Sequence, residues 1–324
     1  MMPRGLRLVR RRLLQAVPVL VFVILGTFLL LAMAPGDAVD AYLAASGGGD
    51  ADLAATLRQD WGIAGPIGGR LLLYLDHLAH LDLGYSVAFA RPVLDVIAER
   101  LINTFLLTGA GLFLAAFFGS LLGIIAALRP GSWRDLLSTS AALALNAMPG
   151  FWLSLVAIII FAVKLTWFPL GGIESLTGKS GLARVVDIAW HLTLPVMTLA
   201  LTYLAIYQRL MRAAMLRSLA SDYIRMAKAK GLPTGRVIWR HACRNAVLPV
   251  ITMLGVQAGS ILGGSVVIES VFAIPGLGRL AYEAVIKRDT PLLIGILLCS
   301  AVVVIIVNLL IDILYSYLDP RIEA

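Results

Sequence analysis

Residues 222–249 read DYIRMAKAKGLPTGRVIWRHACRNAVLP, and this basic stretch decides how the rest of the chain is interpreted. Ser221 can cap a short helix that begins at Asp222, because a serine hydroxyl accepts a hydrogen bond from the first helical turn. An acidic residue in that turn also favours the helix dipole. Gly231 stands at the C-terminal cap position and a proline follows two residues later, so the helix should end there. The pattern predicts a helix over residues 222–230.

This predicted helix has fewer than three turns and would be marginal alone in water. Tyr223, Met226 and Ala227 fall on one face at helical spacing, which gives a small apolar surface that needs a partner. The alternative is a loop helix that lies on the lipid headgroups.

Long apolar runs flank this stretch and recur along the chain. Of 324 residues, 60% are hydrophobic and 14% are charged, and the mean hydropathy is +0.89. A soluble domain carries roughly a quarter charged residues, so lipid must be the solvent for most of this chain. A run of about 20 apolar residues crosses a bilayer. The sequence therefore predicts an all-α membrane protein with six transmembrane helices, at roughly 12–33, 101–127, 136–163, 192–215, 247–268 and 291–317.

The distribution of Lys and Arg predicts the orientation of these helices. If the N-terminus is cytoplasmic, 17 of the 27 Lys and Arg residues fall on the cytoplasmic side. Positive residues gather on that side of a membrane. We therefore expect both termini in the cytoplasm and three extracytoplasmic segments, at 34–100, 164–191 and 269–290. The chain then divides into an anchor helix with one large outer loop over residues 1–100 and a transmembrane domain over residues 101–318.

The first apolar run could instead be a cleaved signal peptide, because three arginines precede it and Ala32-Met33-Ala34 resembles a cleavage site. Its apolar core of about 21 residues is longer than a signal core, and Pro35 stands where cleavage would occur. We expect a retained anchor.

Nucleic-acid and metal binding are not expected. The net charge of +8 and the pI near 9.8 arise from basic residues that flank apolar runs, as membrane orientation signals do. Cys243 and Cys299 form no disulfide or zinc pattern. His77 and His80 lie three residues apart with no third clear ligand nearby, so we predict no metal site.

Specific motifs narrow the class of protein. The run DYIRMAKAKGL at 222–232, with RHACRNAVLP at 240–249, resembles the coupling loop of ABC importer permeases, and within them the dipeptide, oligopeptide and nickel subfamily. The acidic residue of the broader family signature is absent, because Arg225 stands in its place, and the peptide-type subfamily shares that departure. The stretch ESVFAIPGLGR at 269–279 resembles the same subfamily's element after helix five. Shorter matches at APGD (34–37), RPGS (129–132), PGFW (149–152) and DPR (319–321) extend the resemblance over nearly the whole chain.

The resemblance implies the fold of a type I ABC importer transmembrane domain and a pore-forming permease in the bacterial inner membrane. It implies that the short helix docks on a cytosolic ATPase and that ATP-driven closure of the ATPase pair switches the permease between inward-facing and outward-facing states. The implied partners are a second homologous permease, two ATPase subunits or domains, an extracytoplasmic binding protein and membrane lipid. The coupling loop, at 216–249, would act through Asp222, Tyr223, Arg225, Met226, Ala227, Lys228, Gly231, Leu248 and Pro249. The outer turn motif would comprise Phe272, Pro275, Gly276 and Gly278.

Residues 172–180, GIESLTGKS, resemble a phosphate-binding P-loop, but five residues separate the glycines where that loop needs four. No buried strand precedes them, and the expected orientation places them outside the cell. We therefore expect no catalytic residues and no cofactor in this chain, and ATP must be hydrolysed by another polypeptide.

Gly255, Gly259 and Gly263 recur every four residues in the fifth apolar run and share one helix face. Small residues at this spacing let two helix backbones approach closely in lipid. The face could pack within the subunit, or it could lie at the pore or against the partner permease.

The sequence leaves the cargo open among dipeptides, longer peptides, glutathione and nickel or metal chelates. Peptides are favoured because they are the commoner cargo of the subfamily. A secondary transporter that needs no ATPase is the alternative of another class. Six spans without a detectable repeat or a buried carboxylate network argue against it.

Overall fold

A computed structural model describes residues 4–33, 39–40, 43, 48, 50–60, 64–80, 82–86, 88–175 and 178–318. The chain divides into two compact units. The first comprises Met1–Asn103 and Gly276–Ile306, and the second comprises Thr104–Pro275 and Val307–Ala324. Helices α5 (Val93–Leu128) and α14 (Thr290–Leu318) contribute residues to both units.

The first unit contains the predicted anchor helix and the segment predicted to form a large outer loop. Its elements are α1 (Arg4–Met33), α3 (Ala51–Asp60), α4 (Ile67–Ala79), β1 (Tyr85–Ser86), β2 (Arg91–Pro92) and α13 (Leu277–Ile286). Helices α3 and α4 give the segment after α1 regular structure of its own. The antiparallel β1–β2 hairpin, which pairs Tyr85 with Pro92, is an addition to the all-α fold class that the sequence predicted.

A buried aspartate fixes the hairpin to the start of α14. The Asp289 carboxylate accepts hydrogen bonds from the Ser86 hydroxyl at 2.6 Å and from the Ala88 amide at 3.0 Å. It also accepts one from the Leu292 amide at 3.1 Å, in the first turn of α14. A helix start has amide groups without intrahelical partners, so one carboxylate both caps the helix and holds the hairpin.

The second unit is a helical bundle. Beyond its parts of α5 and α14, it contains α6 (Trp133–Ala147), α7 (Gly150–Ala157), the π-helical turn η1 (Ile158–Lys164), α8 (Gly181–Leu219), α9 (Asp222–Ala229), α10 (Thr234–Arg236), η2 (Val237–Ala242), α11 (Cys243–Ala246) and α12 (Leu248–Val271). Among the described residues, α5, α8 and α14 are each long and apolar enough to cross a membrane. The pair formed by α6 and α7–η1 could provide a fourth crossing. The full set of six crossings stays a prediction.

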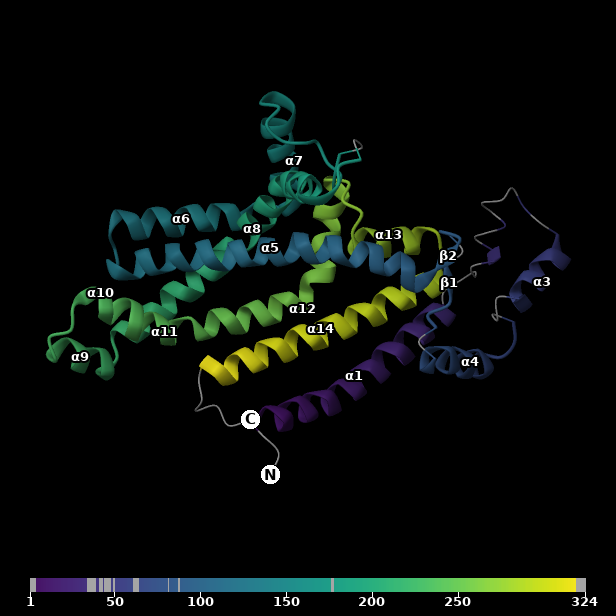
Figure 1. Cartoon of the computed structure of the whole chain (residues 1–324), viewed down its shortest axis with the longest axis horizontal. Coiled ribbons are helices and arrows are strands. Elements are labelled where there is room, and N and C mark those ends of the chain that lie inside the picture. Colours follow the sequence, from purple (N-terminus) through teal and green to yellow (C-terminus); the bar gives the residue numbers. More distant parts are fainter. Residues whose placement is uncertain are drawn as a thin grey trace. The chain divides into compact units, whose positions relative to one another are not determined.

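The third apolar run is broken, which corrects the expectation of one continuous helix over 136–163. The axis turns by 98° between α6 and α7–η1, and α7 visibly turns away from α6 in Figure 1. Met148 is extended, with φ −86° and ψ 131°, as the residue before a proline prefers to be. Pro149 then begins α7 as its N-cap, where a missing amide costs nothing.

Two glycines bring α5 and α8 into backbone contact. A Cβ added at Gly119 would lie 2.8 Å from the carbonyl oxygen of Leu204, and one at Gly123 would lie 2.6 Å from that of Gln208. Only residues without a side chain fit there. The GxxxG spacing of Gly119 and Gly123 is a sequence signal for such a contact in lipid, in addition to the predicted glycine face at Gly255, Gly259 and Gly263.

Candidate functional site: the loop between α8 and α12

The predicted short helix is present and begins where expected. α9 spans Asp222–Ala229 and follows α8 after a two-residue turn. Ser221 occupies the N-cap position, but its hydroxyl donates to the carbonyl oxygen of Ser218 instead of accepting from the first helical turn. The predicted side-chain cap is therefore replaced by a bond that closes the turn onto the end of α8.

The end of α9 confirms the predicted glycine cap. Gly231 has φ +76°, a left-handed conformation that glycine adopts without steric cost. Its amide donates to the carbonyl oxygen of Lys228 at 3.0 Å, and the Leu232 amide donates to that of Ala227 at 3.4 Å. These two bonds form a Schellman motif, which pairs carbonyl groups that the helix itself leaves free.

The exposed surface of α9 differs from the predicted apolar face. Ile224 and Ala227 are buried, whereas Tyr223 is 39% exposed and Met226 is 60% exposed. Ala227 thus belongs to the inner face, because Ile224, three residues before it, already points into the core of the subunit. The outer face presents Met226 together with charged residues.

The outer face of α9 is polar around its methionine. The Arg225 guanidinium lies 2.9 Å from the carboxylate of Asp222, and both side chains are largely exposed. Lys228 is exposed as well. An ion pair this exposed contributes little to stability, so its two charges are available to a partner surface.

Hydrogen bonds hold α9 against the segments before and after it. The hydroxyl groups of Ser218 and Tyr223 lie 2.6 Å apart, and the Ser218 hydroxyl also donates to the carbonyl oxygen of Ala242 at 3.1 Å. Ser218 therefore joins α8, α9 and η2 at one point. The Cys243 thiol is buried beside them, and burial raises its pKa above the ordinary value.

One apolar cluster connects α9 to the membrane helices. Ile224 and Ala227 share this cluster with residues of α5, α8, η2, α11 and α12. Its members include Ala115, Ala127, Tyr207, Met215, Val237, Ala242, Ala246 and Val250. Close-packed interiors transmit displacement and do not absorb it, so a force on α9 reaches several membrane helices. Leu248 begins α12 as predicted, with Pro249 in its first turn.

A bidentate ion pair joins α6 to α8 near the α9 end of α8. The Arg212 guanidinium donates two hydrogen bonds of 2.7 Å to the carboxylate of Asp135. The amide of Gly131 donates to the same carboxylate at 2.9 Å. Asp135 is buried, so these charge-assisted bonds compensate for its lost hydration.

The predicted glycine face of α12 comprises Gly255, Gly259 and Gly263. At Gly255, the glycine of this face whose neighbours are described, the face packs within the subunit. A Cβ at Gly255 would lie 3.0 Å from the Ile311 side chain of α14. Gly259 lies in the same helix, and the surroundings of Gly263 lie outside the described side chains. The role of these two glycines at the pore or at a second permease stays a prediction.

The other end of α12 carries the predicted turn motif. Phe272 is buried, and Ala273 adopts φ +53° in a second Schellman motif. In this motif the Ile274 amide donates to the carbonyl oxygen of Glu269 at 2.8 Å. Pro275 follows, and Gly276 and Gly278 stand at the start of α13. The Glu269 carboxylate is buried and accepts a hydrogen bond from the Thr104 hydroxyl of α5 at 2.7 Å.

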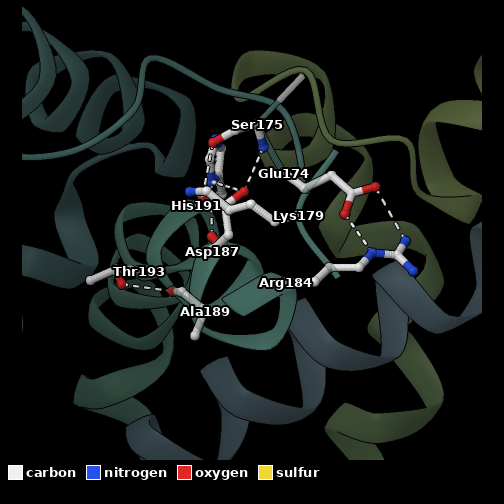
Figure 2. A network of polar contacts seen from close by, with 8 residues as sticks. All are labelled: Glu174, Ser175, Lys179, Arg184, Asp187, Ala189, His191 and Thr193. Atoms are coloured by element: carbon white, nitrogen blue, oxygen red, sulfur yellow. Dashed lines mark hydrogen bonds and ion pairs between the residues drawn. The ribbon is translucent and has the colours of Figure 1, made fainter. Parts of the chain in front are cut away.

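The hydrogen-bond donors of the P-loop-like segment, residues 172–180, bind a carboxylate of the same chain. Figure 2 shows Ser175 and Lys179 converging on Asp187 in the second turn of α8. Asp187 accepts from the Ser175 amide at 2.6 Å, the Ser175 hydroxyl at 2.8 Å and the Lys179 ammonium at 2.6 Å. These three donors of the segment therefore bind a carboxylate of the same chain.

The same segment has a second ion pair and a second attachment point. Arg184 donates to Glu174 at 2.6 Å and holds the pKa of that carboxyl below its ordinary value. The Gly172 amide donates to the carbonyl oxygen of Phe272 at 2.8 Å. This loop is therefore fixed to both α8 and the end of α12.

Replacing Gly171 by alanine should detach this loop from α12. The new Cβ would lie 2.5 Å from the carbonyl oxygen of Phe272, which is backbone and cannot move aside. We expect a loss of about 1–3 kcal/mol, the usual cost of overpacking. Thermal unfolding of the purified protein measures it, with Gly68→Ala as a control because its Cβ meets nothing within 4 Å. Equal midpoints for the two variants would contradict the close approach.

Apolar helices long enough to cross a membrane, with a basic loop packed against them, define the chain as a membrane protein. Comparison with known proteins gives the family. Residues 119–324 match the family of binding-protein-dependent transport system inner membrane components. The chain belongs to this family and is an inner membrane protein.

Curated relatives match along nearly their whole length. A putative peptide transport system permease protein of Brucella suis is 38% identical over 98% of both chains. The dipeptide transport system permease protein of Alkalihalophilus pseudofirmus is 37% identical over 97% of this chain and 98% of its own. The glutathione transport system permease protein of Escherichia coli is 37% identical over 98% of this chain and 99% of its own.

A solved structure shares the fold. The chain resembles an inward-facing structure of the MetNI methionine ABC transporter with a TM-score of 0.56 and 14% identity. The likeness covers 70% of this chain and 97% of the other. The helical bundle therefore has the same fold as the matched chain of this ABC transporter.

Proposed function

We propose that this chain is the pore-forming permease subunit of an ATP-driven, binding-protein-dependent importer, and that α9 is its docking helix for a cytosolic ATPase. The observation that carries the proposal is the construction of α9. Its inner face, with Ile224 and Ala227, belongs to the core that contains the membrane helices. Its outer face leaves Met226 and the charges of Asp222 and Arg225 exposed. A helix exposed on one side and fixed on the other suits the transmission of force.

The complete importer has further parts. The family description names a binding-protein-dependent system, which supports an extracytoplasmic binding protein as a partner. The likeness to an ABC transporter supports two ATPase subunits or domains and a second, homologous permease. In this scheme the chain crosses the membrane six times with both termini in the cytoplasm, and ATP is hydrolysed by the partner subunits.

Peptides are the proposed cargo. Two of the relatives described above have names that specify peptide or dipeptide transport, and a third specifies glutathione, which is itself a tripeptide. All three share 37–38% identity with this chain over nearly its whole length. Nickel or a metal chelate remains the alternative cargo.

Substitution of Gly231 tests the docking helix. Gly231→Val forces a β-branched residue into a left-handed conformation at a cost of about 1–2 kcal/mol or more. The Schellman bonds at the end of α9 should then open, and ATP-driven uptake should fall about tenfold or more, while the subunit still inserts into the membrane. Uptake of a radiolabelled peptide into vesicles that contain the whole importer measures this.

Two variants control that experiment. Gly231→Asn should retain most of the uptake, because asparagine tolerates the left-handed conformation. Gly235→Ala should leave uptake unchanged, since its Cβ meets nothing within 4 Å. Wild-type uptake by Gly231→Val would show that transport does not depend on the glycine cap of α9.

Cysteine cross-linking tests which protein meets α9. Met226→Cys should cross-link to the ATPase subunit in the assembled importer, because this side chain is exposed on the outer face of α9. Ile224→Cys is the matched control, since its side chain is buried two residues away. Lys228→Cys should react with thiol reagents only from the cytoplasmic side. Labelling of that position only from outside the cell would overturn the proposed orientation and the docking role together.

A further inference from the structure

The helix α4 in the first unit carries a surface that the transport scheme does not use. It has 13 residues, and none of them is buried. Neither the proposed ATPase docking helix nor the close helix contacts at glycines described above involve α4. Its length is about 20 Å, which is too short to cross the roughly 30 Å of hydrocarbon in a bilayer. The helix must therefore lie in water, against protein, or along a membrane surface.

The sequence of α4 is divided between two faces. Ile67, Leu71, Leu75 and Leu78 recur at helical spacing on one side, with Leu72 at its edge. Ile67 is 51% exposed, Leu72 is 69% exposed and Leu75 is 36% exposed, whereas Leu71 and Leu78 are half-buried. Asp76, His77 and His80 lie on the opposite side, together with Leu73, which is 47% exposed. The His77 ring pairs with Asp82 at 2.9 Å, so that side carries its own polar network.

An aromatic contact fixes α4 beside the anchor helix. The rings of Tyr74 and Phe28 are stacked with centroids 6.3 Å apart. Phe28 lies in the last third of α1, near the end that the Lys and Arg distribution places outside the cell. Figure 1 shows α4 close to that end of α1. The contact therefore places α4 at the level where the first apolar helix leaves the membrane.

The surface of α1 next to this contact is apolar and exposed. Phe22 is 78% exposed, and Leu25 and Leu29 are exposed too. In a family of inner membrane proteins, an exposed apolar surface on an anchor helix is one that lipid tails cover. The helix α4, which the Tyr74–Phe28 contact joins to α1, lies beside the C-terminal end of this helix.

Arg70 provides charge complementarity to lipid. Its side chain forms no hydrogen bond or ion pair with any residue that the structure describes, and it lies one turn before Tyr74 at the border of the apolar face. An arginine in that position can hold its stem along apolar surface and extend its guanidinium to a phosphate. Lipid headgroups carry phosphate at this depth.

We infer that α4 is an interfacial helix whose leucine face lies in the membrane leaflet at the C-terminal end of α1, with Arg70 bound to headgroup phosphate. The occupant of the surface is lipid. The inference rests on the membrane location of the chain and is independent of its cargo and of the ATPase. Its role is to hold the outer segment flat on the membrane next to the first helix.

Fluorescence quenching in nanodiscs tests this inference on the whole importer. Leu75→Cys, Leu72→Cys and the opposite-face control Asp76→Cys are labelled with bimane in a background with Cys243→Ser and Cys299→Ser. The discs contain phosphatidylcholine with a doxyl quencher at carbon 5 or at carbon 12 of one chain. We expect carbon 5 to quench the Leu75 label at least about twofold more than carbon 12, because an interfacial helix lies about 5–10 Å deep. Aqueous iodide should quench mainly the Asp76 label.

Two results would overturn the inference. Iodide quenching of the Leu75 label equal to that of the Asp76 label would place the face in water. Protection of the Leu75 label from both iodide and doxyl lipid would show that a protein covers it. Arg70→Glu should reduce quenching of the Leu75 label by the shallow doxyl group, and Arg70→Lys should not. Equal quenching in Arg70→Glu and Arg70→Lys would show that Arg70 does not bind headgroup phosphate, and would overturn that part of the inference. ATP-driven uptake by each labelled variant verifies that the importer is intact.

Discussion

Replacing Gly123 by leucine is expected to prevent formation of the folded helix bundle. A Cβ at this position would lie 2.6 Å from the carbonyl oxygen of Gln208, 2.9 Å from the amide of Arg212 and 2.9 Å from the Cβ of Met211. Two of these three atoms are backbone of a continuous helix, so α5 and α8 would have to separate along their whole contact. We expect a destabilisation of more than about 3 kcal/mol, at the upper end of overpacking effects. Little monodisperse subunit should survive solubilisation.

The matched control for this substitution lies in the same helix. A Cβ at Gly109 of α5 would meet nothing within 4 Å, so Gly109→Ala should leave the bundle intact or stabilise it slightly. Size-exclusion chromatography in detergent and thermal unfolding compare the two variants. A monodisperse Gly123→Leu protein with a wild-type unfolding midpoint would show that α5 and α8 are not in backbone contact.

Removal of Arg212 is expected to have the second largest effect. Arg212→Ala leaves the buried Asp135 carboxylate with only the Gly131 amide and a longer bond of 3.4 Å from Thr139 as partners in the described residues. Loss of one partner from a buried pair costs about 3–5 kcal/mol. This cost is reduced by the partial exposure of Arg212, whose side chain is 30% exposed. The thermal midpoint and ATP-driven uptake should fall together.

A double-mutant cycle separates this pair from a general loss of packing. The variant Asp135→Ala/Arg212→Ala removes both charges, so it should be more stable than Arg212→Ala alone. The exposed pair of Arg91 and Glu99 is the control, and Arg91→Ala should change the midpoint little. Additive effects of the two substitutions in the buried pair would contradict their coupling.

The sequence predicted the elements whose signals are local. The start of α9 at Asp222, its glycine cap at Gly231 and the start of α12 at Leu248 all depend on residues within one or two helical turns. The apolar runs of α5, α8 and α14 were also found, because hydropathy over 20 residues depends on composition alone. Their ends extend beyond the predicted ones, to Val93 in α5 and Gly181 in α8, because a helix can continue into water after its apolar run ends.

Features that depend on tertiary packing were not predicted. Ala227 and Met226 have similar local signals, but only the fold decides that the first is buried and the second is exposed. The bend at Pro149 could not be distinguished from a kinked continuous helix by hydropathy, since both sides are apolar. The contact of Gly119 and Gly123 with α8 does have a sequence signal, because the two glycines are four residues apart. The partner of Asp187 had no such signal, because its bonds come from a loop 8–12 residues away.

The continuity of α12 has a geometric consequence for the proposed transport cycle. This helix has 24 consecutive helical residues, about 36 Å along its path, and its ribbon bends partway in Figure 1. One end follows the basic loop directly, and the other holds the Gly171–Gly172 segment through Phe272. A movement of the basic loop is therefore passed to Phe272 and the segment it holds through one hydrogen-bonded helix, whose bend sets the direction of that movement.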